Sequence, residues 1–227
     1  MSVFRRVKTF LQASALTVWW LAFLFGGAGQ VSWRRVWICT VLYLGAFYSC
    51  RAVLKRLNPD LLEQRQPAIR DDTKPFDRLF LRLLLSLTII QPLLAGLDFR
   101  WNGTSMPPWT IYPGIASFIG AAIMITWVLV KNPHAESSVR IQSDRDHRVI
   151  VSGPYRFIRH PMYAGLIQLH QSIALILGST WTVALATMIT ILFYWRTALE
   201  DQTLRRELPG YEEYATVTRY RLMPGLW

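Results

Sequence analysis

Two short polar clusters, each at the border of an apolar segment, carry the groups in this sequence that could do chemistry. The first is the stretch 153–165, GPYRFIRHPMYAG, which brings cationic and titratable groups and two tyrosines to the start of an apolar run. Ionisable side chains are costly to hold at the edge of hydrocarbon, so this cluster indicates a ligand or a partner. Its candidate binding and catalytic residues are Gly153, Tyr155, Arg159, His160, Pro161 and Tyr163.

The first cluster has the pattern of a turn followed by the start of a helix. Gly153-Pro154 predicts the turn, and Pro161 predicts a first helical residue because proline loses no needed hydrogen bond there. His160 then lies near the cap, where exposed backbone amides favour a carboxylate or a phosphate. The plainer interpretation is an interfacial anchor, with arginines on lipid headgroups and tyrosines in the aromatic belt.

The second cluster follows the last apolar run and contains Arg196, Glu200 and Asp201. Arg196 and Glu200 are four residues apart, so on a helix they share a face and can pair. At least one of the adjacent carboxylates, Glu200 or Asp201, can face inward to bind a ribose hydroxyl or an ammonium group. Tyr211 and Tyr214 follow in a short aromatic tail. The alternative is an amphipathic surface helix whose ion pairs contribute little energy.

Membrane helices must position these clusters. The chain is 52% hydrophobic and 17% charged, and its long apolar runs have about the 20 residues that a helix needs to cross hydrocarbon. The last run is longer and is broken at Gly178-Ser179-Thr180, which predicts a hairpin of two helices. We therefore expect an all-α polytopic bundle of about six apolar segments, with five to six crossings. The runs lie at about 10–28, 36–54, 79–97, 111–131 and 162–197.

The basic residues predict the orientation of this bundle. With both termini in the cytoplasm, all but Arg34, Arg35 and Arg100 of the 25 lysines and arginines lie on the inside, as the positive-inside rule expects. Both polar clusters and a cytoplasmic cap then face the same side of what we take to be a bacterial inner membrane. The net charge of +11 fits loops on an anionic leaflet rather than binding to nucleic acid.

Two regions follow from this organisation. Residues 1–130 form the N-terminal membrane helices, and residues 131–227 form a cofactor-binding region. We expect the polar loop 58–77 to be a solvated connector and the segment 131–159 to fold over the mouth of the bundle. We expect no metal site.

The two polar blocks carry a family resemblance. GPYRFIRHPMYAG, an apolar hairpin, and then WRTALEDQTLRRELPGYEEY resemble the C-terminal signature of the isoprenylcysteine carboxyl methyltransferase family over roughly residues 147–224. That family is integral to membranes, uses S-adenosylmethionine and is related to the phospholipid methyltransferases. Residues 1–130 are similar to it only as a run of membrane helices. The paired glutamates of the family correspond here to Glu200 and Asp201.

The resemblance implies roles for the candidate residues. It implies cofactor contacts for Gly153, Tyr155, His160, Pro161, Tyr163, Glu200, Asp201, Tyr211 and Tyr214. It implies catalytic roles for Arg159, His160 and Arg196, the last of these near the carboxylate of the methyl acceptor. These residue types suit the cofactor, because a carboxylate can hold a ribose or an ammonium group, a helix N-terminus can hold a carboxylate, and aromatic faces suit adenine and a sulfonium.

We therefore expect an S-adenosylmethionine-dependent methyltransferase that acts on a lipophilic or prenylated acceptor, by carboxyl O-methylation of an isoprenylcysteine-like substrate. Three alternatives stay open: a phospholipid N-methyltransferase, an NADPH-dependent membrane reductase of the sterol-reductase type, and a non-enzymatic membrane protein that binds lipids through its arginines. The sequence determines neither the acceptor nor the oligomeric state.

Overall fold

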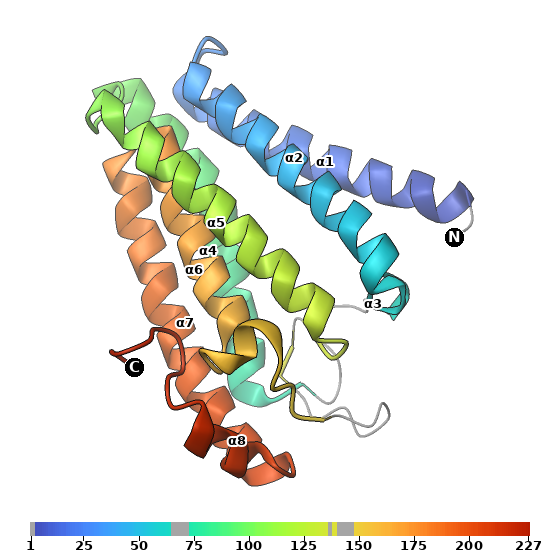
Figure 1. Cartoon of the computed structure of the whole chain (residues 1–227). Coiled ribbons are helices and arrows are strands. Elements are labelled where there is room, and N and C mark those ends of the chain that lie inside the picture. Colours follow the sequence, from blue (N-terminus) through green and yellow to red (C-terminus); the bar gives the residue numbers. More distant parts are fainter. Residues whose placement is uncertain (1–2, 65–72, 136–137, 140–147) are drawn as a thin grey trace.

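Helices make up the whole fold of the described chain (Figure 1). The computed structural model describes residues 3–64, 73–135, 138–139 and 148–227. The helices are α1 (Val3–Ala28), α2 (Arg34–Leu57), α3 (Pro59–Gln64), α4 (Pro75–Asn102), α5 (Ile111–Lys131), α6 (Pro161–Leu177), α7 (Thr180–Glu207) and α8 (Tyr211–Val217), with 3-10 turns at Pro108–Thr110 and Gly153–Arg156. These residues include no strand, so the predicted all-α class is confirmed.

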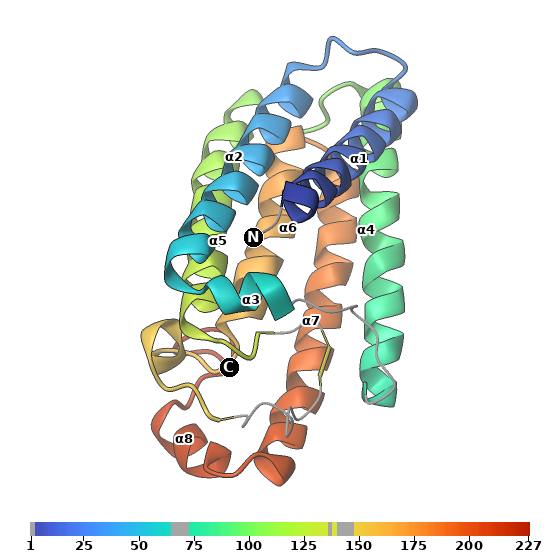
Figure 2. The ribbon, with the colours of Figure 1, turned by 90° about the vertical axis from the view of Figure 1, so that its right-hand side faces the viewer.

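Helices α4, α5, α6 and α7 pack together as a bundle, and α1 and α2 lean obliquely against one side of it (Figures 1 and 2). The turns that join α1 to α2 and α6 to α7 lie at one end of the bundle. The short helices α3 and α8 lie toward the other end. This second end is therefore the one that carries both polar clusters.

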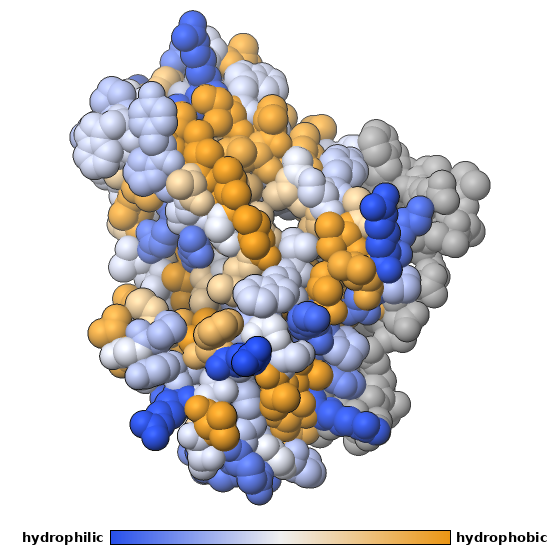
Figure 3. Space-filling view, in the orientation of Figure 1, coloured by the Kyte–Doolittle hydropathy of each residue, from blue (hydrophilic) through white to orange (hydrophobic). Residues whose placement is uncertain are grey.

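Four helical stretches are long and apolar enough to cross a membrane: Arg34–Leu57, Pro75–Asn102, Pro108–Lys131 and Thr180–Glu207. Ser14–Ala28 is a shorter apolar stretch. Apolar side chains cover much of the helical face seen in Figure 3, and hydrophilic ones are frequent around α8. These features are those of an integral membrane protein.

The predicted hairpin between α6 and α7 is present. Gly178 ends α6 with a φ of +71°, a left-handed conformation that favours glycine. Ser179 then caps α7 by accepting a hydrogen bond from the Thr182 amide at 3.2 Å. Asp98 of α4, which is fully buried, accepts from the hydroxyls of Ser179 (2.6 Å) and Ser105 (2.9 Å). A buried carboxylate thus fastens the hairpin turn to α4.

Helices α1 and α4 cross at close range through glycines. A Cβ atom built on Gly96 would lie 2.4 Å from the Leu24 carbonyl oxygen and 2.9 Å from the Gly27 Cα atom. The two backbones therefore pack directly on each other, as is common between membrane helices. Leu24 also belongs to a buried apolar cluster with Ala95 and Ile176, which joins α1, α4 and α6.

Candidate active site

One pocket, about 130 Å³ in volume, lies at the α8 end of the bundle between the segment that enters α6 and the end of α7. Among the predicted site residues, those that line it are Tyr155, Arg159, His160, Tyr163, Glu200, Tyr211 and Tyr214. The first four come from one sequence block and the last three from the other. The fold thus brings the two blocks to one cavity.

The chain enters the pocket through a turn and a helix start, as the sequence predicts. The 3-10 turn Gly153–Arg156 comes first, His160 is the residue before α6, and Pro161 is the first helical residue. The amides of residues 159 and 160 donate to the carbonyl oxygens of Tyr220 and Arg221, both at 2.9 Å. The C-terminal segment is therefore fixed along the entrance to α6.

Gly153 and Pro161 do not line the pocket. Gly153 has a φ of +62°, and a Cβ atom there would lie 2.8 Å from the Lys131 side chain and 3.1 Å from that of Trp127. This glycine lets the turn approach α5 closely. Both residues therefore shape the backbone around the pocket.

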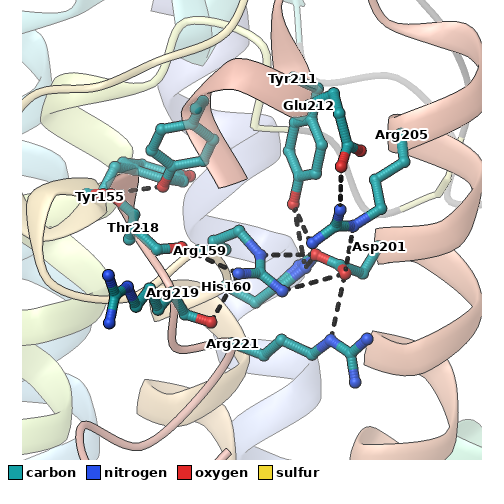
Figure 4. A network of polar contacts seen from close by, with 11 residues as sticks. Tyr155, Arg159, His160, Asp201, Arg205, Tyr211, Glu212, Thr218, Arg219 and Arg221 are labelled. Atoms are coloured by element: carbon teal, nitrogen blue, oxygen red, sulfur yellow. Dashed lines mark hydrogen bonds and ion pairs between the residues drawn. The ribbon is translucent and has the colours of Figure 1, made fainter. Parts of the chain in front are cut away.

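Asp201 is the centre of a buried ionic network (Figure 4). Its side chain has 0% relative exposure. Arg159 binds it with two hydrogen bonds, from Nε at 2.7 Å and from Nη2 at 3.0 Å, and the Tyr211 hydroxyl donates to it at 2.9 Å. Arg205 and Arg221 approach it at 3.3 and 3.1 Å, and His160 Nε2 lies 3.3 Å away.

This network orients pocket residues from three segments. Asp201 itself does not line the pocket, but it contacts Arg159, His160 and Tyr211, which do. Arg159 also donates from Nη1 to the carbonyl oxygens of Thr218 (2.8 Å) and Arg219 (2.7 Å). The Asp201–Arg159 pair therefore joins α7, the entrance to α6 and the C-terminal segment.

Tyrosines form the wall of the pocket beside α8. Tyr214 donates its hydroxyl hydrogen to the Tyr155 carbonyl oxygen at 2.7 Å, and Asn132 Nδ2 donates to the Tyr155 hydroxyl at 2.7 Å. Burial raises the pKa of the Tyr155, Tyr211 and Tyr214 hydroxyls, that of Tyr214 to about 12, and the Asp201 carboxylate adds to the rise at Tyr211. These phenols therefore stay protonated near neutral pH.

Glu200 is the carboxylate that faces the pocket. The Tyr163 hydroxyl donates a short hydrogen bond to Glu200 Oε2, and both residues line the cavity. The Tyr163 ring stacks on the His160 ring, with centroids 5.7 Å apart and an interplanar angle of 11°. As expected, one of the two adjacent carboxylates faces the cavity, and it is Glu200.

Arg196 lies behind the pocket wall. Its side chain is 5% exposed and forms an ion pair with Asp77 of α4, with 2.9 Å between Nε and Oδ1. The guanidinium carbon also lies 4.3 Å from the centre of the Phe80 ring and 4.9 Å from that of Tyr163. Arg196 is not among the residues that line the pocket. Asp77 is therefore a carboxylate that pairs with Arg196 in this structure.

Sequence reasoning missed Asp77, because it placed this residue in the solvated loop 58–77. That expectation is wrong at its end, since α4 begins at Pro75 and Asp77 is fully buried. A carboxylate in the first turn of a membrane-length helix, two residues after the proline that starts the helix, was the available signal.

Part of the segment 131–159 also lines the pocket. Asn132, Val139 and Val149 contribute to its wall, which agrees with the expectation that this segment folds over the mouth of the bundle. Residues 136–137 and 140–147 lie outside the described part of the chain.

A second, larger cavity of about 460 Å³ lies between α2 and α5. Its walls are mostly apolar and include Phe47, Leu54 and Leu129, with Arg51 of α2 among the lining residues. Leu54 and Leu129 belong to an apolar cluster that also contains Met162, a residue of the first pocket. The two cavities thus share one apolar wall.

Comparison with known proteins agrees with these observations. The chain is 26% identical over 140 residues to the cobalt-zinc-cadmium resistance protein CzcN of Cupriavidus metallidurans, a match that covers 57% of this chain and 58% of that protein. Residues 114–206 match the isoprenylcysteine carboxyl methyltransferase family. The resemblance carried by the two sequence blocks is therefore confirmed over residues 114–206, which match a family of membrane methyltransferases.

Proposed function

We propose that this protein transfers a methyl group from S-adenosylmethionine to a lipophilic acceptor at the membrane. One observation carries the proposal: the two blocks of the family motif line a single pocket at the end of a bundle of membrane-length helices. In the orientation expected from the basic residues, this pocket faces the cytoplasm, where a polar cofactor is available.

The residues present fit S-adenosylmethionine. Glu200 would accept hydrogen bonds from the ribose hydroxyls or the ammonium group, and the amides at the start of α6 would favour the carboxylate. The rings of Tyr155, Tyr211 and Tyr214 offer apolar and aromatic surface to the adenine and the sulfonium. When bound, S-adenosylmethionine supplies an electrophilic methyl group.

The apolar cavity between α2 and α5 suits the hydrocarbon part of the acceptor, because it adjoins the polar pocket across a shared apolar wall. The family match favours the carboxylate of an isoprenylcysteine-like lipid as the reacting group. An ionised carboxylate needs no base, so the protein would contribute alignment, worth up to about 7–11 kcal/mol, and exclusion of water. An amine acceptor would instead need His160 as a base.

Equilibrium binding of S-adenosylhomocysteine to the detergent-purified protein tests the cofactor. We expect micromolar binding that exceeds that of NADPH and that weakens about 10- to 100-fold in Glu200→Gln, because one hydrogen bond to a charged group is lost. Glu213→Gln, an exposed change on α8, is the matched control and should bind like the wild type. Absence of binding at millimolar ligand would overturn the proposal, and stronger binding of NADPH would favour the reductase.

A radiolabelled methyl-transfer assay tests the acceptor. The panel should contain a prenylcysteine, a fatty acid and a phospholipid amine, each with the protein in lipid nanodiscs. Labelling of the prenylcysteine alone supports carboxyl O-methylation, and labelling of the amine alone supports an N-methyltransferase.

A further inference from the structure

Helix α4 contains two fully buried aspartates, Asp77 near its start and Asp98 near its end. Asp98 fastens the hairpin turn, far from the pocket. Asp77 lies at the pocket end and is the ion-pair partner of Arg196, whose Nη2 also donates to Asp77 Oδ2 at 3.3 Å. The proposed reaction assigns no role to Asp77, so its complete burial in this place calls for one.

Arg196 sits between two carboxylates. Asp77 approaches it from α4, and Glu200 lies one turn further along α7, close enough for its charge to act on Arg196. Residues four apart on a helix share a face and can pair. A buried guanidinium that loses its counter-ion is strongly unfavourable. Without Asp77, Glu200 on the same helix face is a carboxylate to which Arg196 would turn.

Glu200, however, is needed at the pocket wall. There it accepts the hydrogen bond of Tyr163 and is the carboxylate that reaches the cavity from α7. Pairing with Arg196 would draw Glu200 behind the Tyr163 ring, against which the guanidinium already packs at 4.9 Å. The negative charge would then be neutralised and removed from the ligand.

We propose that Asp77 is a positioning residue of this pocket, which neutralises Arg196 and so leaves the Glu200 carboxylate with Tyr163 at the wall. The inference rests on the proposed function, because it assumes that Glu200 binds the cofactor. The N-terminus of α4 favours a negative charge at residue 77.

A second contact of Asp77 also holds part of the pocket wall in place. Its Oδ2 atom accepts a hydrogen bond from the Val139 amide at 2.6 Å, and the Lys74 amide donates to the Val139 carbonyl oxygen at 3.4 Å. Val139 lines the pocket. One carboxylate therefore fixes both the cation behind the wall and a backbone segment that forms part of it.

Asp77→Asn tests this role, because asparagine keeps the size of the side chain and can still accept from the Val139 amide but carries no charge. We expect S-adenosylhomocysteine binding to weaken about 10- to 100-fold, as in Glu200→Gln, because the Glu200 carboxylate turns to Arg196. Asp98→Asn is the matched control: it removes an equally buried charge from the same helix and should leave the affinity within about threefold of the wild type, a small part of one hydrogen bond.

The double variant Asp77→Asn/Arg196→Gln separates positioning from a general loss of structure. With both charges removed, Arg196 can no longer draw Glu200 away from the wall, and binding should return to within about threefold of the wild type, since the carboxylate again meets the ligand. A merely structural role for Asp77 would give no such rescue. If Asp77→Asn does not fold, the double variant alone decides, because it contains no unpaired charge at this position.

Each outcome is decisive. Wild-type affinity in Asp77→Asn, or a double variant that binds no better than the single one, overturns the inference while the wild-type protein still binds the ligand. If the wild-type protein does not bind S-adenosylhomocysteine at all, the proposed function fails and the inference fails with it.

Discussion

Replacement of Asp201 by asparagine should loosen the whole end of the molecule that carries the pocket. The fully buried carboxylate is bound by two hydrogen bonds from Arg159, which is itself 5% exposed. The substituted side chain would have no charge and would present an amide group toward one of the guanidinium nitrogens. Breaking a buried ion pair from one side costs about 3–5 kcal/mol, because the other charge stays buried without its partner.

Hydrogen exchange measured by mass spectrometry can detect this loss locally. Amides of residues 159 and 160 and of the segment 218–222 should lose protection by about two to three and a half orders of magnitude, at 1.4 kcal/mol per factor of ten. Amides in the middle of α4 and α5 should change little, since the network does not reach them. S-adenosylhomocysteine binding should fall in parallel.

The rim of the same network supplies the control. Glu212 pairs with Arg205, and both side chains are partly exposed, 58% and 34%, so Glu212→Gln should cost less than about 1 kcal/mol. Equal losses of protection in Asp201→Asn and Glu212→Gln would refute the reasoning, because burial would then add nothing to the value of the ion pair.

Two further substitutions test other parts of the molecule. His160→Ala should lower S-adenosylhomocysteine affinity or turnover at least about tenfold. Cys39→Ala, in the buried core of α2, is the control and should leave the affinity unchanged. Equal, negligible effects of the two substitutions would show that the first cluster is only an interfacial anchor. Gly96→Ala should destabilise the protein by about 1–3 kcal/mol in thermal unfolding in detergent, because the new Cβ atom collides with the α1 backbone. Gly45→Ala, at a position with open space around it, is the control and should leave the stability unchanged. Wild-type stability of the Gly96→Ala variant would show that α1 and α4 can separate without cost.

The sequence predicted the parts of this fold that depend on local pattern. The break at Gly178-Ser179-Thr180 placed the hairpin turn because a glycine and a serine have local reasons to end one helix and begin the next. The turn at Gly153 and the helix start at Pro161 follow from the same kind of rule. The resemblance of the two blocks then predicted that they meet.

The partners of the buried charges could not be predicted in this way. Arg196 has an acidic residue one turn away in sequence, yet the ion pair that the structure shows joins it to Asp77, more than a hundred residues earlier. Asp201 has a basic residue one turn away, Arg205, yet the residue that binds it through two hydrogen bonds is Arg159. Such choices depend on which helices lie side by side, and helix periodicity carries no information about that.

The spacing of the two aspartates of α4, Asp77 and Asp98, is close to the thickness of a hydrocarbon layer. At 1.5 Å per residue they are about 32 Å apart along the axis, close to the roughly 30 Å of a hydrocarbon layer. One fastens the start of α7 through Ser179, and the other fastens its far part through Arg196. A single residue inserted between them would rotate one carboxylate by about 100° relative to the other. The number of residues between Asp77 and Asp98 is therefore fixed by the two contacts that α4 makes with α7.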